Sequence, residues 1–270
     1  MTRNSELNYH AKTSGEGEPL VLLHGFSGSG ADWAAHLPAL TPHFRVVTVD
    51  LPGHGKTDSP TDPAHYTIEN MAQDLISLLE SLDLGQVHLL GYSMGGRLAL
   101  YLAIHYPTAI KSLILESASP GLASPEERQA RIASDQALAT QIEQKGLSWF
   151  ADYWGNIPLF ASQKNLQQAI QDDVRARRLN NNPHGLVNSL RGMGTGVQPS
   201  LWPHLSALKR PVLLLTGEHD SKFVAINQQM QTQIPDAQHI IIPDAGHTVH
   251  LEQPVLFEKN ILDFLTSVKR

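Results

Sequence analysis

The feature that most limits the possible folds of this chain is the segment VHLLGYSMGGRLAL at residues 87–100. An apolar run, a glycine-flanked serine and a helical pattern follow one another there without a break. The central GYSMG fits the G-x-S-x-G elbow, which exposes a nucleophilic serine, here Ser93, at the top of an α/β sheet. Glycine leaves room for the tight turn, and Gly96 lets helix and sheet approach closely. The alternative is a serine in an ordinary strand-to-helix turn, and the flanking strand and helix favour the elbow.

Short apolar runs alternate with helical patterns along most of the chain. The runs are brief, rich in Val, Ile and Leu, and bounded by turn residues, which is typical of parallel strands buried on both faces. This alternation predicts an α/β fold with a mainly parallel central sheet, right-handed crossovers and flanking helices. The expected strands are residues 20–26, 45–50, 87–92, 110–116, 212–217 and 239–243, with 7–11 as an antiparallel edge strand, and the expected helices are 68–82, 94–106 and 254–268.

Residues 119–200 interrupt the alternation. They contain no clear strand pattern and are typical of several helices joined by loops such as NNNPHG and GMGTG. We interpret them as a helical cap inserted within a single domain, whose core comprises residues 1–118 and 201–270. A length of 270 residues fits one α/β domain that carries such an insertion.

Two residues are candidates to complete a catalytic triad with Ser93. Folds with this elbow supply the triad in the order serine, acid, histidine. Asp220 closes the run LLLTGEHD and His247 lies in IIIPDAGHTVH, so both follow strands at the sheet edge where ligands bind in open α/β folds. Asp244 and Glu218 are alternative acids, and Asp220 is preferred because only a short turn separates it from its strand.

An oxyanion hole needs two backbone donors. The N–H of Met94 follows the serine at the start of a helix, where the helix dipole favours an anion. The N–H of Phe26, in LLHGFSG, is the second candidate. We expect His24 to be a structural hydrogen-bonding group and His250 to be a neighbour of the site rather than its base.

With these residues, the chain resembles the α/β-hydrolase superfamily along its whole length. More narrowly, it resembles the family of 2-succinyl-6-hydroxy-2,4-cyclohexadiene-1-carboxylate (SHCHC) synthases of menaquinone biosynthesis. The segments that carry this narrower resemblance are GYSMGGR, LESASPGL, ERQARIASD, FADYWGNIPLFASQ, RARRLNNN, SLRGMGTGVQPSLW and GEHDSKF. The resemblance implies an α/β-hydrolase fold with an inserted helical cap.

The resemblance also implies an activity and a set of site residues. The activity is that of a carbon–oxygen lyase, which eliminates pyruvate from a small tricarboxylate by general-base catalysis and without hydrolysing an ester. Ser93, Asp220 and His247 match the triad of the family. The matching substrate-binding residues are Tyr92, Arg97, Arg131, Arg178 and Trp154, with Tyr153 as the alternative to Trp154.

The distribution of arginine supports an anionic ligand independently. Residues 119–200 hold six of the eleven arginines and carry a formal charge of +1, from eight basic and seven acidic residues, within a chain whose net charge is −6. The alternative is that these arginines form a solvated helix face. That alternative fits Arg97 least, because a charge packed behind the elbow is costly unless it is paired. Arg97 is therefore expected to receive a substrate carboxylate, and the alternative is a buried salt bridge to an acidic side chain such as Glu116.

Several other functions are disfavoured by the sequence. The absence of cysteine excludes disulfides and thiolate chemistry, and no zinc, Walker or dinucleotide motif is present, so we expect no metal and no cofactor. The polar N-terminus and the lack of any long apolar run predict a cytoplasmic protein without a membrane span, which we expect to be a monomer. Its mild acidity argues against nucleic-acid binding. The competing functions are a serine hydrolase of an anionic ester or carbon–carbon bond, and a non-catalytic binding module.

Overall fold

The computed structural model describes residues 7–268 and contains a seven-stranded sheet in the order β1-β3-β2-β4-β5-β6-β7. β1 pairs with β3 in antiparallel orientation, and every other neighbouring pair is parallel, as the apolar runs predict. The strands are β1 (Ala11–Ser14), β2 (Glu18–Leu23), β3 (Phe44–Val49), β4 (Val87–Tyr92), β5 (Ile110–Glu116), β6 (Val212–Gly217) and β7 (Ala237–Ile242).

The edge strand lies further along the chain than predicted. Residues 7–11 were expected to form it, but β1 begins only at Ala11, which pairs with Val49. The backbone before it binds the loop after β3 instead: the N–H of His10 donates to Thr57, and the N–H of Asn8 donates to Asp58. These bonds satisfy the polar groups that an edge strand would otherwise present to β3.

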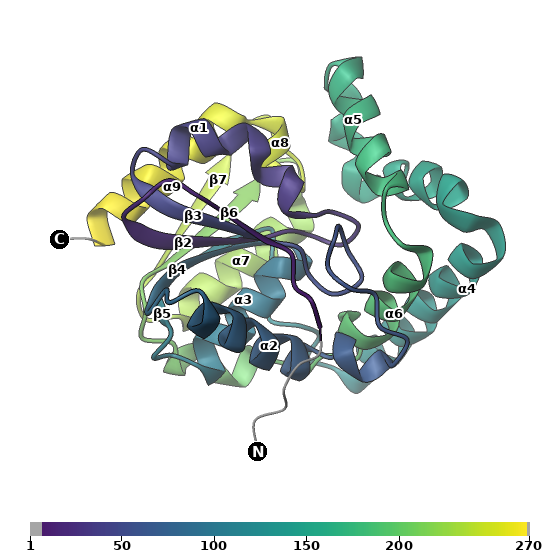
Figure 1. The fold of residues 1–270 in the computed structure, drawn as a ribbon, viewed down its shortest axis with the longest axis horizontal. Helices are drawn as coiled ribbons and strands as arrows, with labels where there is room; N and C mark the ends of the chain where they lie inside the picture. The colour runs from purple at the N-terminus through teal and green to yellow at the C-terminus, as the bar shows by residue number, and fades with distance from the viewer. Residues whose placement is uncertain (1–6, 269–270) are drawn as a thin grey trace.

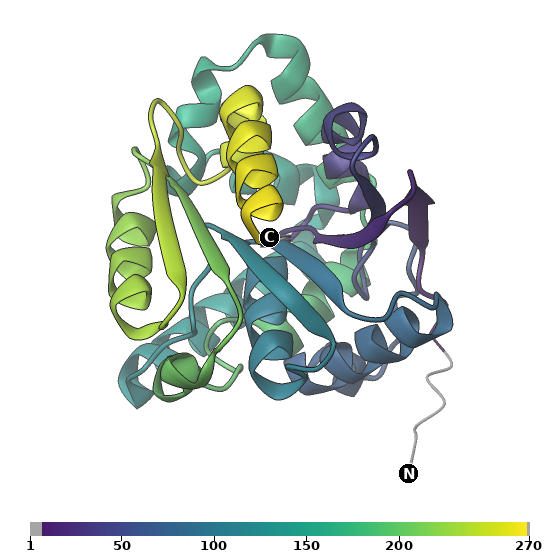
Figure 2. The same ribbon diagram turned by 90° about the vertical axis from the view of Figure 1, so that its left-hand side faces the viewer.

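Helices cover both faces of the sheet (Figure 1; Figure 2). Alternate strand residues face opposite layers, so Val21 and Leu23 pack with α2, α3 and α7, whereas Leu20 and Leu22 pack with α1 and α9. The side chain of Thr67 caps α2 by accepting the N–H of Asn70. The helices of the core are η1 (Gly30–His36), α1 (Leu37–Leu40), η2 (Pro63–Tyr66), α2 (Ile68–Ser81), α3 (Met94–His105), η4 (Trp202–Ala207), α7 (Ser221–Gln233), α8 (Val249–Glu252) and α9 (Pro254–Val268).

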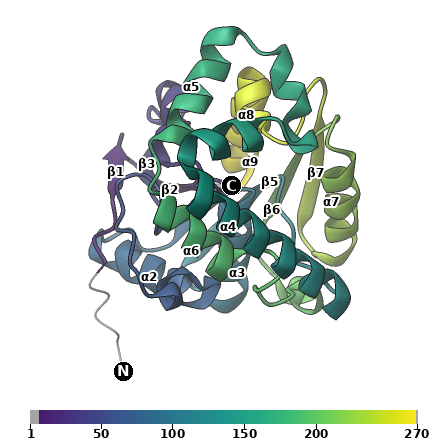
Figure 3. The same cartoon turned by 90° about the vertical axis from the view of Figure 1, so that its right-hand side faces the viewer.

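The chain between β5 and η4 is helical, as expected for a cap. It comprises α4 (Pro125–Gly155), η3 (Pro158–Asn165), α5 (Gln168–Leu179) and α6 (Pro183–Met193). These helices lie together on one side of the sheet (Figure 1) and face the viewer in Figure 3. α4 and α6 share a small core of their own, which includes Ile142, Phe150 and Leu186. The division of the chain at residues 119 and 200 remains a prediction.

None of the helices in the described part of the chain combines the length and the apolarity needed to cross a membrane.

Candidate active site

Ser93 lies in a strained turn between β4 and α3. Its φ of 50° falls in the left-handed region, which non-glycine residues rarely adopt. The turn closes only because its neighbours lack side chains: a Cβ on Gly91 would lie 2.4 Å from the carbonyl oxygen of Gly95, and a Cβ on Gly95 would lie 2.5 Å from that of Leu23. The strain is typical of an elbow that holds a serine hydroxyl out from the sheet.

The structure brings Ser93, His247 and Asp220 together. The Oγ of Ser93 lies 3.0 Å from Nε2 of His247, and Nδ1 of His247 lies 2.6 Å from Oδ2 of Asp220. Because Nδ1–H donates to the carboxylate, Nε2 is free to accept the serine proton. Both the histidine, 1% exposed, and the aspartate, 7% exposed, are shielded from water. This geometry allows proton transfer from serine to histidine.

The remaining acids and histidines take structural positions. Glu218 accepts the N–H of Asp244, and neither residue bonds to His247. The Nε2 of His24 accepts the N–H of Leu51 at 2.9 Å, and its Nδ1 lies 2.7 Å from the carbonyl oxygen of Gly25. Burial lowers the pKa of His24, which keeps the ring neutral in this structural role.

His250 pairs with Glu116, not with the serine. Its Nδ1 lies 2.9 Å from both carboxylate oxygens. The suggested salt bridge between Arg97 and Glu116 is therefore wrong, because Glu116 is fully buried and engaged by the histidine.

The two expected oxyanion donors lie beside the serine. Met94 is the first residue of α3, and a Cβ placed on Gly25, the residue before Phe26, would come within 3.6 Å of the Cβ of Ser93. Within residues 7–268, no hydrogen bond engages the N–H of Phe26 or of Met94. Two adjacent unengaged donors can stabilise negative charge that develops on a substrate oxygen.

A cavity of about 660 Å³ opens over the serine. Both core and cap contribute to its wall. Ser93, Met94, His247 and Phe223 belong to the core, and the cap supplies an aromatic and polar roof. The predicted site residues that line it are Phe26, Ser93, Met94, Arg97, Arg131, Trp154 and His247, and Tyr153 lines it as well.

Arg97 reaches this cavity from the first turn of α3. Its Nη1 donates to the main-chain oxygen of Met193, at 2.7 Å, and to the side-chain oxygen of Gln198. Burial, and then the nearby Arg131, lower the pKa of Arg97 to about 9, so the guanidinium is still protonated at neutral pH. Its described partners are neutral oxygens, which leave the positive charge uncompensated by any direct acid.

Arg131, unlike Arg97, is bonded to a carboxylate. Its Nε donates to Oδ1 of Asp135, one helical turn away, at 2.8 Å. Burial raises the pKa of Asp135, and the two arginines Arg131 and Arg97 oppose that rise. Asp135 therefore offsets the charge of one of these two arginines.

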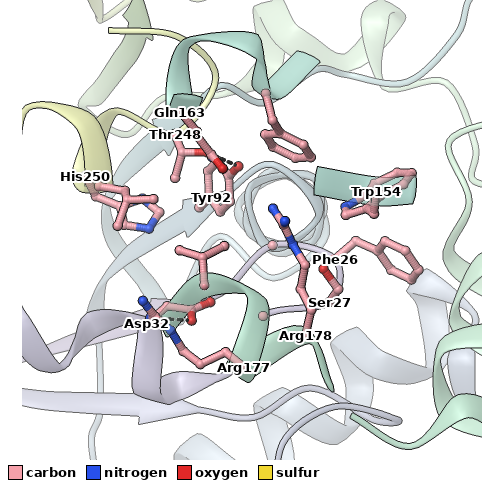
Figure 4. Close-up of a pocket in the computed structure, with 15 residues that line it drawn as sticks. Phe26, Ser27, Asp32, Tyr92, Trp154, Gln163, Arg177, Arg178, Thr248 and His250 are labelled. Carbon is pink, nitrogen blue, oxygen red and sulfur yellow. Dashed lines mark hydrogen bonds and ion pairs between the residues drawn. The ribbon is translucent and has the colours of Figure 1, made fainter. Parts of the chain in front are cut away.

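Tyr92 and Arg178 line a second, smaller cavity of about 60 Å³, which shares Phe26 and Trp154 with the large one. In Figure 4, Arg178 extends between Tyr92 and the pair Phe26 and Trp154. Its guanidinium lies 5.3 Å from the ring centre of Phe160, and it donates to no acceptor in the described part of the chain. Burial lowers the pKa of Arg178 and raises that of Tyr92, so an arginine cation faces a neutral phenol.

The choice between Tyr153 and Trp154 follows from their packing. Tyr153 is 47% exposed and stacks on Trp149 at the outside of α4. Trp154 packs edge-on against Phe26 and lines both cavities. Of the two, only Trp154 lines both cavities, and its contact with substrate remains a prediction.

Some residues at these cavities were missed from the sequence. The hydroxyl of Thr248 lies 2.8 Å from that of Tyr92 and accepts the amide of Gln163, which links core to cap (Figure 4). Arg177 bonds to Asp32 across the same boundary, at 2.8 Å. No local pattern distinguishes these residues from ordinary surface polar groups, since their partners lie 85 or more residues away in the chain.

Lys222 was also missed, although a signal for it exists. It is the second residue of α7, where the helix dipole disfavours a cation, and it lines the large cavity. A lysine in that position, two residues after the predicted triad acid, is better explained by an anionic ligand than by the helix. Among residues 7–268, no group of three or more His, Asp or Glu side chains is placed to hold a metal ion.

Comparisons with known proteins agree with this architecture. Residues 18–254 match the family model described as the alpha/beta hydrolase fold. The chain is 47% identical over 93% of its length to a Bacillus subtilis (strain 168) protein, covering 91% of it, whose assignment as a 2-succinyl-6-hydroxy-2,4-cyclohexadiene-1-carboxylate synthase is itself provisional. It is 34% identical to the protein of that name from Enterobacter sp. (strain 638), with 92% of each chain covered. The solved structure of MenH from S. aureus superposes with a TM-score of 0.93 at 37% identity, over 97% of this chain and 99% of that one.

The sheet, the elbow and the inserted helices define an enzyme built on the α/β-hydrolase fold. Within that class, the chain belongs to the family of 2-succinyl-6-hydroxy-2,4-cyclohexadiene-1-carboxylate synthases.

Proposed function

We propose that this protein eliminates pyruvate from 2-succinyl-5-enolpyruvyl-6-hydroxy-3-cyclohexene-1-carboxylate to give SHCHC, in menaquinone biosynthesis. The observation that carries the proposal is the charge of the two cavities. With histidine counted as neutral, five cationic side chains and two carboxylates line them, which leaves three net positive charges. These side chains are Arg97, Arg131, Arg177, Arg178 and Lys222, and Asp32 and Asp135. Three uncompensated cations match a substrate with three carboxylates.

The first chemical step is proton abstraction. Asp220 holds the imidazole of His247 in the tautomer that accepts a proton at Nε2. His247 draws the proton from Ser93, and the serine oxygen then removes the ring proton next to the succinyl carbonyl of the substrate. The N–H groups of Phe26 and Met94 stabilise the enolate oxygen that results.

Elimination completes the reaction. The enolate electrons move into the ring, a ring double bond forms, and the bond between ring carbon and enolpyruvyl oxygen breaks. The leaving group takes up a proton and becomes pyruvate. The arginines hold the carboxylates so that the ring proton and Ser93 meet in a reactive geometry.

The alternative is a serine hydrolase, because an elbow serine with the same partners can also act as a nucleophile. The two mechanisms differ in covalency. As a base, Ser93 carries no substrate-derived group at any stage, whereas a hydrolase forms an acyl-serine.

The experiment is pyruvate release from the tricarboxylate substrate, measured for the parent protein and for Ser93→Ala, with intact-mass analysis of enzyme quenched during turnover. We expect release by the parent, its loss in the variant and no adduct. An adduct on Ser93 that forms and decays at the turnover rate would establish the hydrolase mechanism instead. The expected monomeric state, cytoplasmic location and lack of cofactor and of nucleic-acid binding remain predictions from the sequence.

A further inference from the structure

Glu252 lies outside the walls of both cavities, yet it binds the chain on either side of His247. Its Oε2 accepts the N–H of Gly246 at 2.8 Å, and its Oε1 accepts the N–H of Thr248 at 3.2 Å. One carboxylate therefore accepts the N–H groups of the two residues on either side of the histidine. We propose that Glu252 is a positioning residue, which fixes the main chain of His247 and through it the imidazole against Ser93.

The one-turn helix α8 turns the carboxylate back toward the histidine. The N–H of Glu252 donates to the carbonyl oxygen of Thr248 at 3.0 Å. The same turn is fixed to the sheet, because the N–H of His250 donates to Oε1 of Glu116 at 3.0 Å. Glu116 ends β5 and is fully buried. The carboxylate of Glu252 is thus carried by a segment that is itself held in place.

Other bonds hold the neighbouring groups, since the N–H of His219 donates to the carbonyl oxygen of Ala245 and the hydroxyl of Thr248 lies 2.8 Å from that of Tyr92. Within residues 7–268, only Glu252 accepts the N–H groups of Gly246 and Thr248. Gly246 has no side chain, and a Cβ there would lie 2.1 Å from the hydroxyl of Ser162, so Ser162 would have to move to admit one. Hydrogen bonds from an amide to an ionised carboxylate are stronger than those to neutral acceptors. Without Glu252, two partly enclosed N–H groups lose their acceptor and the segment gains freedom to move.

Small movements matter at this position. The imidazole must keep 3.0 Å to Ser93 and 2.6 Å to Asp220 at the same time. A misplacement of about 1 Å can cost about a hundredfold in rate. Because Glu252 itself lines neither cavity, its loss is expected to lower kcat and to leave KM unchanged. The inference rests on the proposed action of His247 on Ser93, but not on the identity of the substrate.

The test is the variant Glu252→Gln, together with Glu252→Ala, which removes both acceptor oxygens. The amide of glutamine keeps one acceptor and turns an NH₂ group toward the other N–H. We expect kcat to fall by roughly tenfold to a hundredfold, with KM within about twofold of the parent. We expect the labelling of Ser93 by a neutral fluorophosphonate, counted per folded molecule, to slow by a similar factor.

Two further variants calibrate the result. Glu258→Gln makes the same change to another partly buried carboxylate. Glu258 lies on α9 and binds Nδ1 of His36 at 2.8 Å, and its replacement should leave both kcat and the labelling rate of Ser93 unchanged. His247→Ala removes the proposed base, so it shows how fast the fluorophosphonate labels Ser93 when no base is present. If His247→Ala does not slow labelling, the proposed triad itself fails.

If His247→Ala slows labelling and Glu252→Gln does not, or if Glu252→Gln raises KM with kcat unchanged, Glu252 is not a positioning residue. Equal losses of kcat in Glu252→Gln and Glu258→Gln would also overturn the inference, because they would indicate a general loss of stability. Should Glu252→Ala fail to fold, the milder glutamine variant still decides.

Discussion

The guanidinium of Arg97 donates to the main-chain oxygen of Met193 at 2.7 Å, which joins the helix behind Ser93 to the last residue of α6. The charge therefore lies at the boundary of core and cap, on the wall of the large cavity, and no carboxylate among residues 7–268 is bonded to it. That placement explains why a long cation follows the elbow where a small apolar residue would pack more easily.

Replacing Arg97 tests whether it binds substrate. A hydrogen bond to a charged group is worth about 1.5–3 kcal/mol, so Arg97→Ala should lower kcat/KM on the tricarboxylate by roughly tenfold to a hundredfold. Arg97→Lys should recover only part, because a point charge cannot replace the planar fork. A neutral ester, if it is hydrolysed as a side reaction, should be almost unaffected. Equal losses on both substrates would mean that Arg97 supports the elbow and does not bind substrate.

Lys222 should contribute to substrate capture from the rim. An exposed ion pair is worth about 0.2–1 kcal/mol, so Lys222→Met should raise KM by up to about fivefold and leave kcat unchanged. The variant should also show a weaker rise of KM with salt than the parent, since one screened attraction is gone. Lys209→Met, an exposed lysine outside both cavities, is the control. An unchanged KM in Lys222→Met would mean that this lysine does not bind a substrate carboxylate.

The elbow should not tolerate a methyl group at Gly95. The added Cβ would meet the main-chain oxygens of Leu23 and His24 at 2.5 and 2.6 Å, and backbone at the centre of the sheet cannot move aside. We expect Gly95→Ala to cost more than about 4 kcal/mol in the free energy of unfolding, measured in urea. Gly85→Ala should cost only about 1–2 kcal/mol, because its φ is 59° but no atom lies within 4 Å. Similar costs for the two variants would contradict the packing argument.

Glu18 should make stability depend on pH in acid. Lys111, bonded at 2.5 Å, and His88 lower the pKa of Glu18 from 4.5 to about 2. A carboxyl whose pKa is lower in the folded state stabilises the fold above its unfolded pKa, and this contribution disappears as pH falls from about 4.5 to 2.

Because the side chain of Glu18 is 39% exposed, solvent screening limits the effect to about 0.5 kcal/mol. The measurement is the difference in unfolding free energy between the parent and Glu18→Gln at several pH values. That difference should shrink in the acid range, and a difference that is constant with pH would refute the linkage.

The central strands of the sheet and the position of its elbow could be predicted because their signals are local. The strands expected at residues 87–92, 110–116 and 212–217 coincide with β4, β5 and β6. Apolar runs of that length suit strands buried on both faces, and Gly91 is required by its contacts with Gly95 and Gly96, a few residues along the chain.

The partners of the charged groups could not be predicted in the same way. The sequence favoured a carboxylate receptor for Arg97 and kept a salt bridge with Glu116 as the alternative. Packing decided against the salt bridge by placing His250 on that glutamate. The acceptors of Arg97 come from Met193 and Gln198, about a hundred residues further along the chain.

The sequence by itself therefore determined the α/β fold and the position of the serine turn, because these depend on periodicity and on near neighbours. The motif at that turn then predicted the order of serine, acid and histidine. Only the tertiary structure decided which neutral oxygens hold Arg97, how the site divides into two cavities, and that Glu252 accepts the N–H groups of the residues on either side of His247. These relationships depend on how the inserted helices and the loop after β7 pack against the rest of the fold. That placement follows from the packing of whole surfaces, which leaves no short pattern in the chain.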